Sequence, residues 1–133
     1  MKKVYILLIM CIFISACETE YTNIPVRKIN FTVSINATNL VHVGGYEYFT
    51  GGISGIVVYR FDMTTFYAYD RACPYDWEDG GRVSMVDSKL HDSLCGSSFN
   101  VLNGFPYSDS KTNLPLRQYK TVLIDDLTLQ VYN

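Results

Sequence analysis

Residues 66–75 read Phe-Tyr-Ala-Tyr-Asp-Arg-Ala-Cys-Pro-Tyr, and residues 95–100 read Cys-Gly-Ser-Ser-Phe-Asn. The first stretch opens with Phe66–Tyr69, which predicts a β-strand because aromatic residues favour strands and turn residues precede it. Each stretch also contains one cysteine, Cys73 or Cys95. The two stretches therefore indicate strand structure next to two cysteine-bearing segments.

The chain on either side of these stretches also predicts strands. Phe31, Val33 and Ile35 alternate with polar residues, and a period of two is typical of a strand with one buried face. The further predicted strands are Leu40–Val43, Tyr46–Thr50, Ile56–Phe61, Val83–Val86, Lys89–Leu94, Asn100–Leu102, Tyr119–Ile124 and Leu127–Tyr132. Hairpin turns are expected at Asp87-Ser88 and at Asp125-Asp126. Short strands with frequent turn residues predict an all-β antiparallel sandwich or barrel.

Composition narrows the class of protein further. A chain of 133 residues allows one domain of ordinary size. Its 48% hydrophobic and 18% charged residues exclude general disorder. The formal net charge of −2 lacks the basic character expected of a nucleic-acid-binding protein. We therefore expect a single folded domain with no nucleic-acid partner.

The N-terminus has the layout of a secretory signal. Met1-Lys2-Lys3 is basic, Val4–Ile14 is apolar, and Ile14-Ser15-Ala16-Cys17 resembles the bacterial lipobox. This predicts a lipoprotein signal peptide over residues 1–16, a lipidated tether over 17–24 starting at Cys17, and a folded domain over 25–133. An ordinary cleaved signal peptide and an uncleaved anchor are the alternatives.

Lipidation implies a location and a partner. Several acyl chains on Cys17 would hold the protein durably on a membrane. We therefore expect a protein of the bacterial cell envelope, lipid-anchored outside the inner membrane and at the outer membrane. The expected partners are the membrane itself, through the lipid, and an envelope protein.

The cysteine-bearing stretches resemble a known family. Residues 66–75 are similar to the strand and first cluster-binding loop of Rieske iron–sulfur domains, and residues 95–100 to their second loop. Gly104 and Asn113–Tyr119 match the downstream glycine and the Leu-Pro-x-x-Tyr segment of that family. The likeness runs from about Gly55 to Tyr132. It implies an all-β, Rieske-like antiparallel β-sandwich of small sheets with two hairpins that resemble cluster-binding loops.

The resemblance also implies ligand positions, which this sequence fills differently. A Rieske centre has two cysteine and two histidine ligands. Cys73 stands at the first cysteine position, but Tyr75 replaces histidine. In the second loop Asp92 stands at the cysteine position and Cys95 at the histidine position. Because these are changed ligand types, we expect no metal and no cofactor at the former cluster-ligand positions.

The resemblance further implies that the two loops approach each other. Cys73 and Cys95 would then lie close together in a compartment that permits disulfides. We expect a disulfide between them, which would stabilise the domain by roughly 3 kcal/mol on the chain-entropy account.

A metal site is the alternative. Cysteine, histidine and aspartate are all zinc ligands, so Cys73, His91, Asp92 and Cys95 form a candidate set for zinc or for a rebuilt 2Fe–2S cluster. If residues 89–95 are extended, however, His91 and Cys95 share one face and Asp92 points to the other.

Two functional interpretations follow. The first is an envelope lipoprotein that acts as a structural or binding module, stabilised by the disulfide, after loss of the cluster ligands. The alternative is an electron-transfer or redox accessory protein with metal or 2Fe–2S at non-standard ligands. We expect no catalytic residues, because the sequence contains neither a nucleophile with a matching base nor an evident carboxylate pair.

Overall fold

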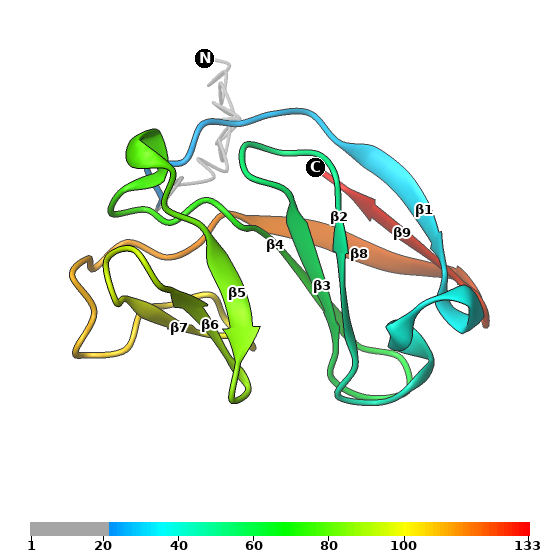
Figure 1. The fold of residues 1–133 in the computed structure, drawn as a ribbon. Helices are drawn as coiled ribbons and strands as arrows, with labels where there is room; N and C mark the ends of the chain where they lie inside the picture. The colour runs from blue at the N-terminus through cyan, green and yellow to red at the C-terminus, as the bar shows by residue number, and fades with distance from the viewer. Residues whose placement is uncertain (1–21) are drawn as a thin grey trace, which may run out of the picture.

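Two antiparallel sheets form the domain in the computed structural model, which describes residues 22–133 (Figure 1). The larger has six strands in the order β1-β9-β8-β4-β3-β2, and the smaller has three in the order β5-β6-β7. The strands are β1 (Asn30–Ser34), β2 (Tyr46–Phe49), β3 (Ile56–Arg60), β4 (Phe66–Asp70), β5 (Val83–Val86), β6 (Lys89–Asp92), β7 (Ser98–Asn100), β8 (Gln118–Asp125) and β9 (Thr128–Tyr132). The expected all-β, Rieske-like class is confirmed.

Strand β8 connects the two halves of the larger sheet. Its first residues, Gln118 and Tyr119, pair with β4, and Lys120 onward pairs with β9. Because β8 changes its partner partway along, the sheet curls around a first core cluster. That cluster contains Ile29, Val33, Ile35, Leu40, Ile56, Val58, Phe66, Ala68, Tyr119, Leu129 and Val131.

A second core cluster fills the space between the two sheets. It contains Val57, Tyr69, Cys73, Val83, Leu90, Cys95, Phe99, Val101 and Leu116. Strand β3 contributes to both clusters, since Ile56 and Val58 face the first and Val57 faces the second. Burial on both faces explains why the sequence of β3 is an uninterrupted apolar run.

Three short 3-10 helices complete the described chain: η1 (Ile35–Ala37), η2 (Asn39–Val41) and η3 (Trp77–Asp79). The strand predicted over 40–43 is therefore wrong, and η2 lies there instead. The Thr38 hydroxyl accepts a hydrogen bond from the Leu40 amide, which starts the helical turn, and Leu40 is buried by it. Among residues 22–133, no helix is long and apolar enough to span a membrane.

Both predicted hairpins are present. Strands β5 and β6 pair through Val86 and Lys89 around Asp87-Ser88, and β8 and β9 pair around the turn after Asp125. The signal peptide predicted over 1–16 and the lipidated Cys17 lie outside the described residues.

Candidate metal centre

The first loop of the site connects β4 to β5. The Cys73 carbonyl accepts hydrogen bonds from the amides of Asp76 and Trp77, at 3.2 and 2.9 Å. Helix η3 follows and is capped by Gly80, whose φ of 94° lies in the left-handed region that favours glycine. The amide of Cys73 in turn donates to the Gly81 carbonyl. The loop therefore folds back on itself and brings the side chain of Asp76 next to that of Cys73.

The second loop connects β6 to β7 in a tight turn. Leu90 and Asp92 occupy the buried face of β6, so Asp92 extends the face that Leu90 presents to the second core cluster. The Asp92 carbonyl accepts from the Gly96 amide, and the Asp92 amide donates to the Ser97 carbonyl. This closure brings Cys95 back over the end of β6.

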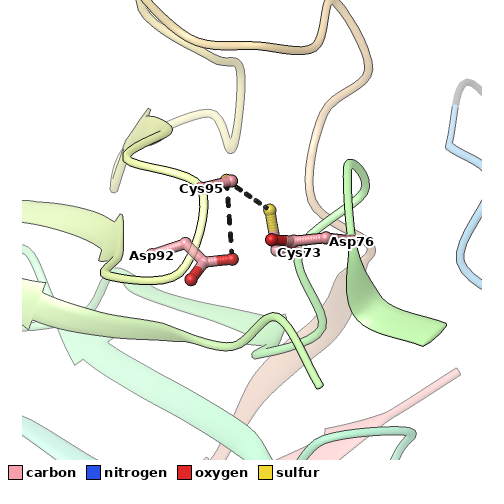
Figure 2. A group of neighbouring side chains, drawn as sticks. All are labelled: Cys73, Asp76, Asp92 and Cys95. Carbon is pink, nitrogen blue, oxygen red and sulfur yellow. Dashed lines mark hydrogen bonds between the residues drawn. The ribbon is translucent and has the colours of Figure 1, made fainter. Parts of the chain in front are cut away.

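The two loops bring together four side chains, Cys73, Asp76, Asp92 and Cys95 (Figure 2). One ligand atom from each lies within 4.8 Å of all the others. The two sulfurs are 3.7 Å apart, and Cys95 Sγ is 3.7 Å from Asp92 Oδ2. Cys73 and Asp92 are 0% and 1% exposed. The group is therefore a buried set of two thiols and two carboxyls, which we call the CDDC group.

The expected disulfide is not formed in this structure. A disulfide bond is about 2.05 Å long, whereas the two sulfurs are 3.7 Å apart and both cysteines are free. Cys95 Sγ also lies 3.2 Å from Ser97 Oγ and accepts a hydrogen bond from the Ser97 amide. The predicted proximity of the cysteines is present, but their sulfurs are arranged as members of a larger group.

Two features show that the CDDC group fits a metal. Asp76 Oδ1 is buried and has no hydrogen-bond partner among the described residues. Gly81 leaves space beside it, since a Cβ built there would overlap Asp76 Oδ1 and come within 2.8 Å of Asp92 Oδ2. A buried carboxyl oxygen without a partner is costly, and thiolates with carboxylates form an accepted ligand set. The residues present therefore fit a metal.

Burial and the neighbouring acids shift the pKa of three of these groups, Cys73, Asp76 and Asp92. Burial raises the pKa of the Cys73 thiol well above its ordinary value, and the neighbouring Asp92 and Asp76 raise it further. Burial, and after it Asp92, also raises the pKa of Asp76. For Asp92, burial acts in the same direction, but the Leu94 amide and the neighbouring acids outweigh it, so its pKa is lowered. A bound cation would favour the charged form of all four groups, because ligands bind metals deprotonated.

The predicted site residues are only partly brought together. Cys73, Asp92 and Cys95 join the CDDC group, whereas Tyr75 is 54% exposed and lies outside it. His91 also lies outside, because it occupies the opposite face of β6 and its Nδ1 bonds Ser98 Oγ at 2.9 Å. The alternative ligand set was therefore wrong at His91. It also missed Asp76, which the repeated spacing Cys73-x-x-Asp76 and Asp92-x-x-Cys95 could have revealed.

Comparison with solved structures identifies related folds. A scan against protein-family models finds no match, and a search of curated proteins finds none. A chain of the complex of reduced oxygenase and oxidized ferredoxin in carbazole 1,9a-dioxygenase matches with a TM-score of 0.56 and 20% identity, covering 80% of this chain and 94% of that one. The Sphingomonas yanoikuyae B1 ferredoxin matches with a TM-score of 0.53 and 14% identity, covering 80% and 99%. The ferredoxin of carbazole 1,9a-dioxygenase from Nocardioides aromaticivorans IC177 matches with a TM-score of 0.50 and 19% identity, covering 80% and 97%.

These similarities confirm the Rieske-like fold and correct one expectation. The sequence predicted that the domain has no cofactor. The similar structures are ferredoxins, Rieske-type proteins in which this fold holds a 2Fe–2S cluster, and the CDDC group gathers four ligand-type side chains in this chain. The expectation of an absent cofactor was wrong because it judged each ligand position separately and did not include Asp76.

Proposed function

We propose that this protein is an accessory electron-transfer protein of the cell envelope whose metal cofactor is held by non-standard ligands between the two loops. The observation that carries the proposal is the convergence of Cys73, Asp76, Asp92 and Cys95 within 4.8 Å of one another. Four acids in so small a buried space are expensive in their charged forms unless a cation compensates them. A structural module without a cofactor would have no need of this arrangement.

The chain's own residues bind the metal and exclude water from it. When bound, the metal supplies one-electron chemistry: one electron is taken from a reduced donor protein and passed to an oxidised acceptor protein. Val83, Leu90 and Phe99 are fully buried in the same cluster as Cys73 and Cys95. The Ser97 amide donates a hydrogen bond to Cys95 Sγ, which orients that sulfur within the second loop.

The proposed partner is another protein of the envelope. One of the similar chains comes from a complex of an oxygenase with a ferredoxin, so a chain of this fold is compatible with a protein partner. Tyr75 and Leu94 are 54% and 61% exposed, and each lies within two residues of a ligand cysteine. We propose that these two apolar side chains contact the partner and shorten the electron path to the metal.

We also propose that Cys17 carries the lipid, at the outer membrane. Asn23 Nδ2 donates to the Pro74 carbonyl, and the Ile24 carbonyl accepts from Arg117 Nε, both at 2.8 Å. The chain therefore joins the domain beside the first metal loop. Cys17 and Asn23 are six positions apart, a span of at most about 20 Å, so the metal would lie near the membrane surface.

Fractionation of cells that express the full chain tests the anchor. Cys17→Ser should move the protein from the membrane fraction to the soluble fraction. Cys11→Ser is the matched control, because Cys11 lies inside the predicted signal peptide, and it should leave the protein in the membrane fraction. A Cys17→Ser protein that stays in the membrane fraction would contradict lipidation and favour an uncleaved anchor.

Metal analysis and redox titration of the full chain test the electron-transfer proposal. The protein, purified anaerobically in detergent from iron-supplemented cells, should contain iron and show a visible absorption band. Dithionite should change that band, and reoxidation should restore it. A protein with no transition metal, or with one that dithionite does not affect, would contradict the proposal.

A further inference from the structure

The distances within the CDDC group carry information about what it holds. Metal–sulfur bonds of about 2.3 Å and metal–oxygen bonds of about 2.0–2.2 Å place tetrahedral ligands of one zinc-like ion roughly 3.3–3.8 Å from one another. In this structure Sγ–Sγ and Cys95 Sγ–Asp92 Oδ2 are both 3.7 Å. Both distances fall within the range expected for the edge of a tetrahedron around one ion.

A two-iron cluster requires a different arrangement. Its ligands form two pairs, one on each iron, and the bridging sulfides lie between the irons. Ligands on opposite irons are therefore further apart than ligands that share a metal. All four ligand atoms of the CDDC group lie within 4.8 Å of one another. The group thus lacks the separation into two pairs.

The charge of the CDDC group also favours a bound cation. In their metal-binding forms the two thiolates and two carboxylates are negatively charged, and in residues 22–133 no ion pair from Lys or Arg to Asp76 or Asp92 compensates them. Asp92 Oδ1 accepts from the Leu94 amide at 2.8 Å, which leaves Oδ2 toward Cys95. Asp76 Oδ1 has no partner. One oxygen of each carboxyl is therefore available to a shared cation.

We propose that the CDDC group binds a single divalent first-row transition metal ion in a tetrahedral site of two thiolates and two carboxylates, and not a 2Fe–2S cluster. This inference rests on the proposed metal site and specifies its content. Iron and zinc share the required chemistry, because both accept thiolate and carboxylate ligands in tetrahedral geometry. Of these two metals, only iron would also support the electron-transfer function.

Metal and acid-labile sulfide measured on the purified full chain separate the outcomes. One iron per chain without sulfide would support both the inference and the electron-transfer function. One zinc per chain without sulfide would support the inference and overturn the function. Two irons and two sulfides per chain would overturn the inference and leave the function standing. No metal after purification under reducing conditions would overturn both.

Titration of the reduced, metal-free full chain with Co²⁺ provides a second readout that needs no redox activity. Binding should saturate at one Co²⁺ per chain and give the intense visible absorption of a tetrahedral thiolate complex. Asp76→Asn should weaken Co²⁺ binding at least tenfold, since loss of even an outer-shell partner costs this much in known metal sites. Saturation at two equivalents, or an octahedral spectrum, would contradict the inference.

The matched control is Asp79→Asn, which removes an exposed carboxyl from η3 in the same loop, three residues after Asp76. It should bind Co²⁺ like the unchanged protein. Cys95→Ser provides a check from the second loop and should abolish the thiolate absorption from that ligand. Circular dichroism of each variant establishes that it folds. Equal weakening by Asp76→Asn and Asp79→Asn would overturn the assignment of Asp76 as a ligand.

Discussion

Two buried tyrosines differ in one contact, and this difference predicts opposite effects of the same substitution. The Tyr119 hydroxyl donates to Asp70 Oδ2 at 2.8 Å, whereas the buried Tyr69 hydroxyl has no partner among the described residues. Tyr119→Phe should lower the free energy of unfolding by about 1–3 kcal/mol, because Asp70 loses a donor while it stays buried. Tyr69→Phe should leave the free energy of unfolding unchanged or raise it by about 1 kcal/mol, because no hydrogen bond is lost. Urea unfolding at 25 °C measures both, and equal losses would contradict the difference.

Gly80 and Gly81 are adjacent glycines with different requirements. Gly80 has a positive φ and open space around it, whereas Gly81 has ordinary φ but no room for a Cβ beside Asp76 and Asp92. The atoms that a Cβ at Gly81 would meet are the carboxyl ends of Asp76 and Asp92, so Gly81→Ala should fold if these side chains shift. Their displacement should weaken Co²⁺ binding at least tenfold. Gly80→Ala should instead cost about 1–2 kcal/mol of stability and leave Co²⁺ affinity unchanged. Co²⁺ titration and urea unfolding of both variants distinguish these effects, and the reverse pattern would show that the space at Gly81 is not part of the site.

Single residues also show how far the sequence predicts the site. Cys73, Asp92 and Cys95 were found because the resemblance fixed their positions in two loops. Asp76 was not predicted because the resemblance places the second ligand of the first loop at position 75, where an exposed tyrosine stands. The side chain of Asp76 reaches the site only because the amides of Asp76 and Trp77 both bond the Cys73 carbonyl. The repeated spacing of Cys73-x-x-Asp76 and Asp92-x-x-Cys95 could mark Asp76 as a candidate, but the hydrogen bonds that place it depend on the folded loop.

At the scale of elements, the β5–β6 hairpin contains a turn that is not optimal for its sequence. Asp87 and Ser88 have φ values of 47° and 62°. Two positive values correspond to a tight two-residue turn, for which Asp-Gly is a preferred pair. Ser88→Gly should raise the free energy of unfolding by about 1 kcal/mol, because glycine adopts this conformation without steric cost. Thermal unfolding measures the gain in stability. Ser110→Gly would be an unsuitable control, because the Ser110 hydroxyl makes hydrogen bonds to the Ser98 backbone in β7.

Asp109→Gly is a better control for that experiment, since Asp109 is exposed and forms no described hydrogen bond. It should lower stability slightly or leave it unchanged, because glycine increases the freedom of the unfolded chain. A Ser88→Gly variant that loses as much stability as Asp109→Gly would contradict the turn assignment.

The elements that the sequence predicted well are those with a strong pattern. Strand β3 is continuous in apolar residues because both of its faces are buried, and β1 alternates because one face is exposed. Leu40–Val43 was predicted as a strand from four residues, a length at which apolar patterns do not separate strand from helical turn. There the Thr38 side chain and the core position of Leu40 decide the structure.

At the scale of the whole molecule, the CDDC group ties the two sheets together. Cys73 and Asp76 belong to the chain that leaves β4 of the larger sheet, and Asp92 and Cys95 belong to the smaller sheet and its turn. The smaller sheet has only three short strands, which is little structure to be stable alone. A metal shared by the two loops would therefore stabilise the packing of one sheet on the other, in the second core cluster.

Metal removal should consequently loosen one half of the molecule and spare the other. A ligand that binds only the folded state at a hundred times its Kd adds about 2.7 kcal/mol of stability. Amide hydrogen exchange of the full chain, with Co²⁺ and after chelation, should show lost protection in residues 72–98 and no change in β1, β8 and β9. The two loops are the only described segments that the metal would cross-link, whereas β1 and β9 contribute no ligand and pair with each other over their full length. Uniform loss of protection over both sheets would show that the metal acts on global stability instead, and no loss in residues 72–98 would contradict a ligand role for the CDDC group.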